Sequence, residues 1–286
     1  MLERLSDAVR GGLRQWSEAI AGERFEAARA AAHITREQNE YGVDPFGFDP
    51  EYALAAIAPL MWLYRYYFRV ETFGLEKLPT KRVLLVSNHS GQLPLDGAMI
   101  AMATLLDGKP SRPIRSMVEK WVPSLPYVST FMARLGQIVG TPENCRRLLQ
   151  SEEAILVFPE GVRGVTKLWP QRYQLQDFGL GFMRLALETD SPIVPVGVVG
   201  AEEQSPAFLN IKPLAKLFQM PAFPLTPLGL PLPLPAKYRI YFGEPLTFTG
   251  RADEEDTELD RKVAVVKSAI AQLLERGLSE REHVFW

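Results

Sequence analysis

The feature that most constrains the fold of this 286-residue chain is an alternation of short apolar runs with longer amphipathic segments, beginning at residue 83. The runs VLLVS, AILVF and IVPVGVV are bounded by turn residues and have the length of buried strands. The strands are expected at 83–87, 114–118, 137–139, 154–158, 193–199 and 237–242, and the helices at 97–106, 121–135, 143–150, 178–189 and 257–276. This alternation predicts an α/β fold in which helices flank a mainly parallel sheet.

The chain before this region lacks the alternation. We expect an N-terminal helical segment at 1–70 and an α/β domain at 71–286. Residues 1–40 read as helix, with an apolar stripe that docks on the body of the protein or on a membrane surface. The stripe consists of Leu5, Val9, Leu13, Trp16 and Ile20.

Two apolar stretches raise the question of membrane contact. Residues 52–64 carry no charge, but the run holds Pro59, ends at Arg65 and is shorter than the roughly 18–20 residues that span a bilayer. This helix, expected at 51–68, is either part of the core or lies in the membrane interface. Residues 217–236 are also uncharged, and their six prolines exclude a spanning helix, so this segment either covers the core or touches lipid.

Composition excludes several classes of protein. The chain has 32 Lys and Arg against 34 acidic residues, and a net charge of −2 disfavours a nucleic-acid partner. The single Cys145 excludes an intramolecular disulfide and a cysteine-based zinc finger. The three histidines are far apart, which disfavours a His-rich metal site. The charged N-terminus is not a secretory signal, and we expect a cytoplasmic protein.

The segment VLLVSNHSGQLPLDGAMI, residues 83–100, places a histidine just after a predicted strand. Chemistry in open α/β sheets gathers at the carboxyl ends of strands, and a histidine there can act as a general base. Asp96 is the nearest carboxylate that can orient His89. Asp96 also stands where a helix N-cap belongs, so its role remains open at this point.

A second strand-to-turn segment is AILVFPEGVRG, residues 154–164. Gly161 allows a close approach of the backbone to a ligand, and Arg163 can present a forked set of donors to a phosphate. Glu160 can accept a hydrogen bond from a sugar or glycerol hydroxyl. A plain strand-to-loop turn with a surface ion pair explains the same residues equally simply.

Together the two segments resemble the glycerolipid acyltransferase family, of the lysophosphatidic-acid acyltransferase type. Asn88, His89 and Asp96 match its first motif, and the Phe-Pro-Glu-Gly at 158–161 matches a later one. The strand that contains Val194-Pro195-Val196-Gly197 looks like the last block. The resemblance implies His89 and Asp96 as catalytic residues. It implies substrate binding by Glu160, Gly161, Arg163, Lys120 and Arg146.

This chain departs from the family pattern in two places. Six residues separate His89 from Asp96 where the family usually has four, which looks more like the branch related to diacylglycerol acyltransferases. The arginine usual in the second block is missing after Ile138, and Arg146 or Arg147 is the expected substitute. Between residues 109 and 172, ten basic residues stand against five acids, which suits an anionic ligand or an ordinary solvated face.

The resemblance implies an acyltransferase that moves a fatty acyl group to a hydroxyl of a glycerolipid or lysophospholipid. The donor is an acyl thioester, either acyl-CoA or acyl carrier protein, and no bound cofactor or metal is required. We expect the protein to sit peripherally or monotopically on the inner face of the membrane. The alternatives are a lipid hydrolase or transacylase, and a non-catalytic lipid-binding protein of the same fold.

Overall fold

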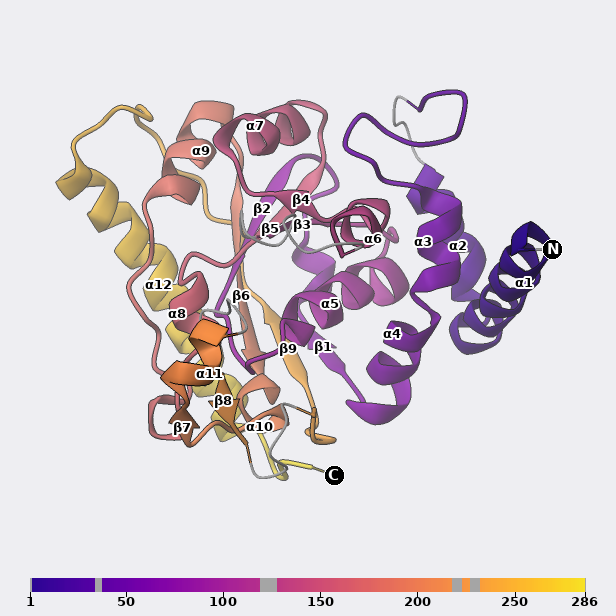
Figure 1. Ribbon diagram of the computed structural model, residues 1–286. Coiled ribbons are helices and arrows are strands. Elements are labelled where there is room, and N and C mark those ends of the chain that lie inside the picture. Colours follow the sequence, from indigo (N-terminus) through magenta and orange to yellow (C-terminus); the bar gives the residue numbers. More distant parts are fainter. Residues whose placement is uncertain (1, 34–37, 119–127, 218–222, 227–231, 286) are drawn as a thin grey trace.

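A seven-stranded sheet runs through the middle of the molecule and confirms the expected α/β fold (Figure 1). The structure is a computed structural model that describes residues 2–33, 38–118, 128–217, 223–226 and 232–285. Neighbouring strands are parallel except β6 and β9. In sheet order the strands are β1 (Glu71–Phe73), β9 (Arg239–Phe242), β6 (Ile193–Val199), β2 (Val83–Ser87), β5 (Ala154–Val157), β3 (Arg115–Val118) and β4 (Ile138–Val139).

Helices cover both faces of the sheet, which explains why β2 is apolar at nearly every position. Val83 and Leu85 pack with the N-terminal helices and α5, whereas Leu84 and Val86 pack with α7, α9 and α12 on the other face. These helices are α5 (Leu95–Met102, continued by a π-helical turn, Ala103–Asp107), α7 (Pro142–Gln150), α9 (Gly181–Thr189) and α12 (Asp256–Ser279). All four were expected from the sequence.

Shorter elements fill the connections. They are α6 (Val128–Arg134), α8 (Val162–Val165), α10 (Ala201–Gln204), α11 (Lys212–Leu217), two 3₁₀ turns (Leu75–Lys77 and Trp169–Gln171) and the antiparallel pair β7 (Leu209–Asn210) and β8 (Pro224–Leu225). Most were not predicted, because segments of two to six residues leave no periodicity to read. Residues 121–127 of the helix expected at 121–135 lie outside the described residues.

The N-terminal region differs from the single helix expected at 1–40. It forms α1 (Leu2–Ala21) and α2 (Arg24–His33), separated at Gly22, whose φ of +59° ends the first helix. The apolar stripe expected on α1 is only partly used, since Val9 is 58% exposed and Trp16 is 41% exposed. The helix docks through Ile20 of this stripe and through Ser17, whose hydroxyl donates to the Leu54 carbonyl at 2.7 Å.

The helix expected at 51–68 is three short pieces: α3 (Pro50–Ala56), α4 (Ala58–Trp62) and a π-helical turn, Leu63–Tyr67. The first break falls at Ile57, two residues before Pro59. Met61 and Phe68 are fully buried, whereas Trp62 and Tyr66 are 41% and 55% exposed. One face therefore belongs to the core and the other is open. No helix within the described ranges combines the length and apolar character needed to cross a bilayer.

The proline-rich segment at 217–236 is described only in part. Where it is described, Leu225 and Leu232 are 40% and 56% exposed, and Ala236 is buried. The Pro233 carbonyl accepts a hydrogen bond of 2.7 Å from the Tyr67 hydroxyl. This part of the segment therefore packs beside the π-helical turn while it keeps leucine side chains at the surface.

A buried ion pair ties the loop at 41–49 to the sheet. The Arg115 guanidinium on β3 donates to Asp44 Oδ2 at 2.7 Å and to the Gly136 carbonyl at 2.9 Å. The other Asp44 oxygen accepts from the backbone N–H groups of Phe46 and Phe48. The side chains of Asp44 and Arg115 are 4% and 1% exposed, so each depends on the other for compensation of its charge.

We predict that Asp44→Ala lowers the free energy of unfolding by about 3–5 kcal/mol, because it leaves a buried arginine without its carboxylate. Urea unfolding followed by circular dichroism measures the change. The control is Asp253→Ala, which removes a carboxylate whose side chain is 70% exposed and should leave the midpoint in place. Equal midpoints for both variants would contradict the role given to Asp44.

Candidate active site

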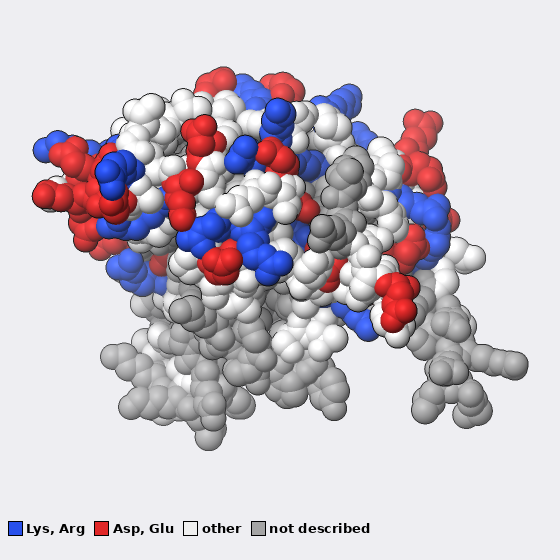
Figure 2. All heavy atoms as spheres, turned by 90° about the horizontal axis from the view of Figure 1, so that it is seen from above, with Lys and Arg blue, Asp and Glu red and all other residues white. Residues whose placement is uncertain are grey.

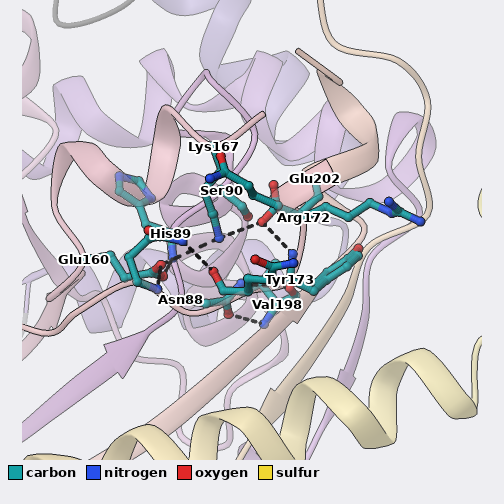
Figure 3. A network of polar contacts seen from close by, with 12 residues as sticks. Asn88, His89, Ser90, Glu160, Lys167, Arg172, Tyr173, Val198 and Glu202 are labelled. Atoms are coloured by element: carbon teal, nitrogen blue, oxygen red, sulfur yellow. Dashed lines mark hydrogen bonds and ion pairs between the residues drawn. The ribbon is translucent and has the colours of Figure 1, made fainter. Parts of the chain in front are cut away.

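Two polar loops meet where β2 and β5 end. Val86 of β2 pairs with Val157 of β5, so the strands finish level with each other at the same edge of the sheet. His89 follows the first strand by two residues, and Glu160 follows the second by three. The backbone N–H of His89 donates to Glu160 Oε1 at 2.9 Å, which joins the two loops directly (Figure 3).

The structure brings His89 and Asp96 together in spite of the lengthened spacing. His89 Nδ1 lies 2.7 Å from Asp96 Oδ2, and the same oxygen accepts from the Ser90 N–H at 2.9 Å. Asp96 is not the N-cap of α5, because the helix begins at Leu95 and its N-cap is Pro94. The other oxygen, Oδ1, accepts from the N–H of Gly97 at 2.8 Å. Asp96 is fully buried, and its charge is satisfied entirely by these donors.

This contact favours one tautomer of the His89 imidazole. A carboxylate on Nδ1 keeps the proton there and leaves Nε2 as the basic nitrogen. The ring stacks on Phe158, with centroids 4.0 Å apart and an interplanar angle of 19°. The His89 side chain is still 13% exposed, so it is not sealed in the core. Such an imidazole can take a proton from a hydroxyl at Nε2 and then release it.

Asn88 anchors the loop to the neighbouring strand. Its side-chain nitrogen donates to the Val198 carbonyl at 3.1 Å, and its oxygen accepts from the Val198 N–H at 2.8 Å (Figure 3). The amide thereby continues the pairing of β2 with β6 beyond the end of the strand. Asn88 is fully buried, and the two bonds satisfy both ends of its amide.

Glu160 has partners different from the substrate hydroxyl expected from the sequence. Its carboxylate accepts from the His89 N–H through one oxygen and from the Gln176 N–H, at 2.8 Å, through the other. The residue is 2% exposed. Both oxygens are occupied by the protein, so we revise its role from binding the acceptor to holding the His89 backbone.

A second buried charge pair lies behind Glu160 and was missed from the sequence. Lys167 Nζ lies 2.8 Å from Glu202 Oε1 and 3.7 Å from Glu160 Oε2 (Figure 3). Burial raises the pKa of the Glu202 carboxyl to about 6, against the opposing effect of the Lys167 ammonium. The signal available in the sequence was a lone lysine in an otherwise uncharged stretch, GVTKLWP.

Two glycines let α8 press against the histidine loop. Gly161 has φ +56° and ψ −144°, a conformation that is easy only for glycine. A Cβ on Gly164 would lie 2.7 Å from His89 Cβ and 2.9 Å from the His89 carbonyl oxygen. Gly164 was not singled out in the sequence, since nothing local distinguishes a glycine in close contact from one in open space.

The structure places the expected substrate-binding cations Arg163 and Arg146 at different edges of the sheet. Arg163, on α8 beside this contact, has a side chain that is 59% exposed and donates to the Asp177 carbonyl at 2.9 Å. Arg146 instead bonds to Glu188 at 2.8 Å, in the last turn of α9, which leads into the amino end of β6. That is the edge of the sheet opposite to His89, so we drop Arg146 from the set. Lys120 lies outside the described residues.

We predict that Gly164→Ala destabilises the protein by about 1–3 kcal/mol, because the new methyl group must displace either His89 or α8. Thermal unfolding measures the change. The matched control is Gly181→Ala, where a Cβ meets no atom within 4 Å. The control should keep or slightly raise the melting temperature, since alanine favours a helix. A Gly164→Ala protein as stable as the wild type would show that the contact is not tight.

Several known proteins are similar to this chain. A family model described as "Acyltransferase" matches residues 69–199. An uncharacterised protein of Mycobacterium leprae is 39% identical over 285 residues, covering 94% of this chain and 77% of that protein. A Bos taurus protein named "DGAT1/2-independent enzyme synthesizing storage lipids" is 25% identical over 204 residues, covering 68% of this chain and 57% of that one.

A solved structure has the same fold. The crystal structure of the 1-acyl-sn-glycerophosphate (LPA) acyltransferase PlsC from Thermotoga maritima matches with a TM-score of 0.54 at 16% identity. The match covers 95% of this chain and 96% of the other. The family model spans β2, β5 and β6, the strands whose ends carry the His89 loop, Glu160 and the Val198 contact. The chain belongs to the acyltransferase family.

Proposed function

We propose that this chain transfers a fatty acyl group from an acyl thioester to a hydroxyl of a glycerolipid or lysophospholipid, with His89 as the general base. The observation that carries the proposal is the 2.7 Å contact between His89 Nδ1 and Asp96 Oδ2, at a sheet edge shared with the 158–161 loop. Membership of the acyltransferase family supports the reaction class. The donor is proposed to be acyl-CoA or acyl carrier protein.

In this mechanism His89 Nε2 takes the proton of the acceptor hydroxyl while the hydroxyl oxygen attacks the thioester carbonyl. Asp96 holds the ring and stabilises the imidazolium that forms. The tetrahedral intermediate collapses, the carbon–sulfur bond breaks, and the thiolate takes the proton back from Nε2. The products are an ester and a free thiol, and neither a metal nor a covalent enzyme intermediate is required.

The negatively charged oxygen of the tetrahedral intermediate needs hydrogen-bond donors other than those nearest the histidine. The backbone N–H groups of His89 and Ser90 already donate to Glu160 and Asp96. Within the described part of the chain, the N–H groups of Gly91 and Gln92 make no hydrogen bond. We therefore assign oxyanion stabilisation to this part of the loop.

The identity of the acceptor depends on Arg163. This guanidinium is exposed beside the histidine loop and can reach a phosphate, which suits a lysophosphatidate-like acceptor. The name of the Bos taurus relative refers to storage lipids, and this supports a neutral glycerolipid hydroxyl as the alternative. Comparison of the two acceptors with the wild type and Arg163→Ala separates them, because only a phosphate-bearing acceptor should lose affinity.

We predict that His89→Ala and Asp96→Asn each lower the rate of acyl transfer by about 10²–10⁴-fold, the usual contribution of a general base. The assay follows release of free thiol from an acyl-CoA in the presence of the acceptor. The control is His283→Ala, which removes an exposed histidine near the C-terminus.

Retained turnover in a folded His89→Ala protein would exclude this mechanism. Fatty acid released by the wild type without any acceptor would favour a lipid hydrolase. Unchanged binding to lipid vesicles with no turnover in any form would favour a non-catalytic lipid-binding protein.

We also propose that the protein binds peripherally or monotopically to the inner face of the membrane. The supporting observation is a group of large apolar side chains left at the surface by the N-terminal helices and the proline-rich segment. They are Val9, Trp16, Trp62, Tyr66, Leu225 and Leu232. Aromatic side chains are favoured at the headgroup level of a bilayer, where their rings replace contacts with water.

We predict that the double variant Trp62→Ser, Tyr66→Ser lowers partitioning onto phospholipid vesicles by about tenfold or more, because two interfacial side chains are lost. Vesicle co-sedimentation measures the fraction bound. The control is Tyr41→Ser, an aromatic residue that is 79% exposed on the 41–49 loop. Equal loss in both variants would place the lipid contact elsewhere.

A further inference from the structure

The loop between His89 and Asp96 is longer than the family pattern, and its extra length forms a tight double turn. Gly91 has φ +88° and Gln92 has φ +60°, both in the left-handed region. The N–H of Leu93 bonds to the Gly91 carbonyl, and the N–H of Leu95 bonds to the Leu93 carbonyl. Such a loop needs external support, because a left-handed glutamine costs free energy and each turn is closed over only three residues.

Gln204, the last residue of α10, supplies that support. Its side-chain nitrogen donates to the Gly91 carbonyl at 2.9 Å and to the Leu93 carbonyl at 3.0 Å. Its side-chain oxygen accepts from the Tyr238 hydroxyl. Both Gln204 and Tyr238 are fully buried.

The two loop carbonyls determine which way the amide faces, because a carbonyl oxygen only accepts and would repel an amide oxygen in the same place. The NH₂ group of Gln204 therefore points at the Gly91 and Leu93 carbonyls, and the Tyr238 hydroxyl donates to the amide oxygen. The contact is close, since a Cβ on Gly91 would lie 2.4 Å from Gln204 Nε2. The amide therefore links the loop to the segment that leads into β9, across β6.

We propose that Gln204 is a positioning residue, which holds the lengthened loop so that Asp96 Oδ2 reaches both His89 Nδ1 and the Ser90 N–H. Gln204 touches none of the reacting groups and acts through the Gly91 and Leu93 carbonyls. The expected effect of Gln204 on turnover rests on the proposed function. Its expected effect on the His89 tautomer rests only on the contacts described above.

Two variants test the proposal. Gln204→Met keeps the length of the side chain and removes its donors and acceptor, and Tyr238→Phe removes only the hydroxyl that donates to the amide oxygen. The matched control is Gln272→Met on the exposed face of α12. The first measurement is the ¹⁵N spectrum of histidine-labelled protein, in which the signal absent from His89→Ala belongs to His89.

In the wild type we expect His89 as the tautomer with its proton on Nδ1. In Gln204→Met we expect a mixture of tautomers, and in Tyr238→Phe a smaller shift in the same direction. The second measurement is acyl transfer, where kcat should fall at least tenfold in Gln204→Met while KM for the donor stays within threefold. Gln272→Met should match the wild type in both measurements.

A Gln204→Met protein with the wild-type tautomer and wild-type kcat would overturn the proposal. If Gln204→Met does not fold, an unchanged tautomer and kcat in Tyr238→Phe overturns it in the same way. A wild type without transfer activity, whose His89 tautomer nevertheless changes in Gln204→Met, would support the positioning role and refute the proposed function.

Discussion

The site depends on one buried carboxylate oxygen with two donors. Asp96 Oδ2 accepts from His89 Nδ1 and from the Ser90 N–H, and Oδ1 accepts from the N–H of Gly97. A carboxylate removed from water is tolerated only when donors of this kind surround it. The donors come from the loop after β2 and from the first turn of α5. The same contact thus orients the imidazole and closes the loop that carries it.

Behind this contact lies a layer of buried charges that holds the backbone and leaves the reacting atoms free. Glu160 joins the His89 N–H to the Gln176 N–H, and Lys167 lies between Glu160 and Glu202. Removal of one member would leave another unpaired in a medium of low dielectric constant. We infer that these residues matter mainly for the rigidity of the site. Arg163 is the exposed cation on α8 that remains available beside it.

The surface carries both clusters of charge and exposed apolar side chains. Acidic and basic side chains crowd around the start of α12 at the left of Figure 2, where Lys262 pairs with Glu254 and Arg184 pairs with Asp256. Large apolar side chains remain exposed on the N-terminal helices, as at Trp16 and Trp62. Of the ten basic residues counted at 109–172, Arg115 and Lys167 are buried, as is the acidic Glu160. The local charge count therefore overstates the positive charge offered to a ligand.

The sequence by itself determined the α/β architecture and the two segments that form the site. Apolar runs such as that at 83–87 are local signals, and a histidine or Phe-Pro-Glu-Gly directly after one lies at the carboxyl edge of the sheet whatever the strand order. Only the tertiary structure decided the partners of Glu160, Arg146 and Gln204. Each bonds to a residue at least 16 positions away in the sequence. The sheet order β6-β2-β5 brings the elements that carry these partners beside one another. No local periodicity encodes that order, because it follows from how all the strands and helices pack at once.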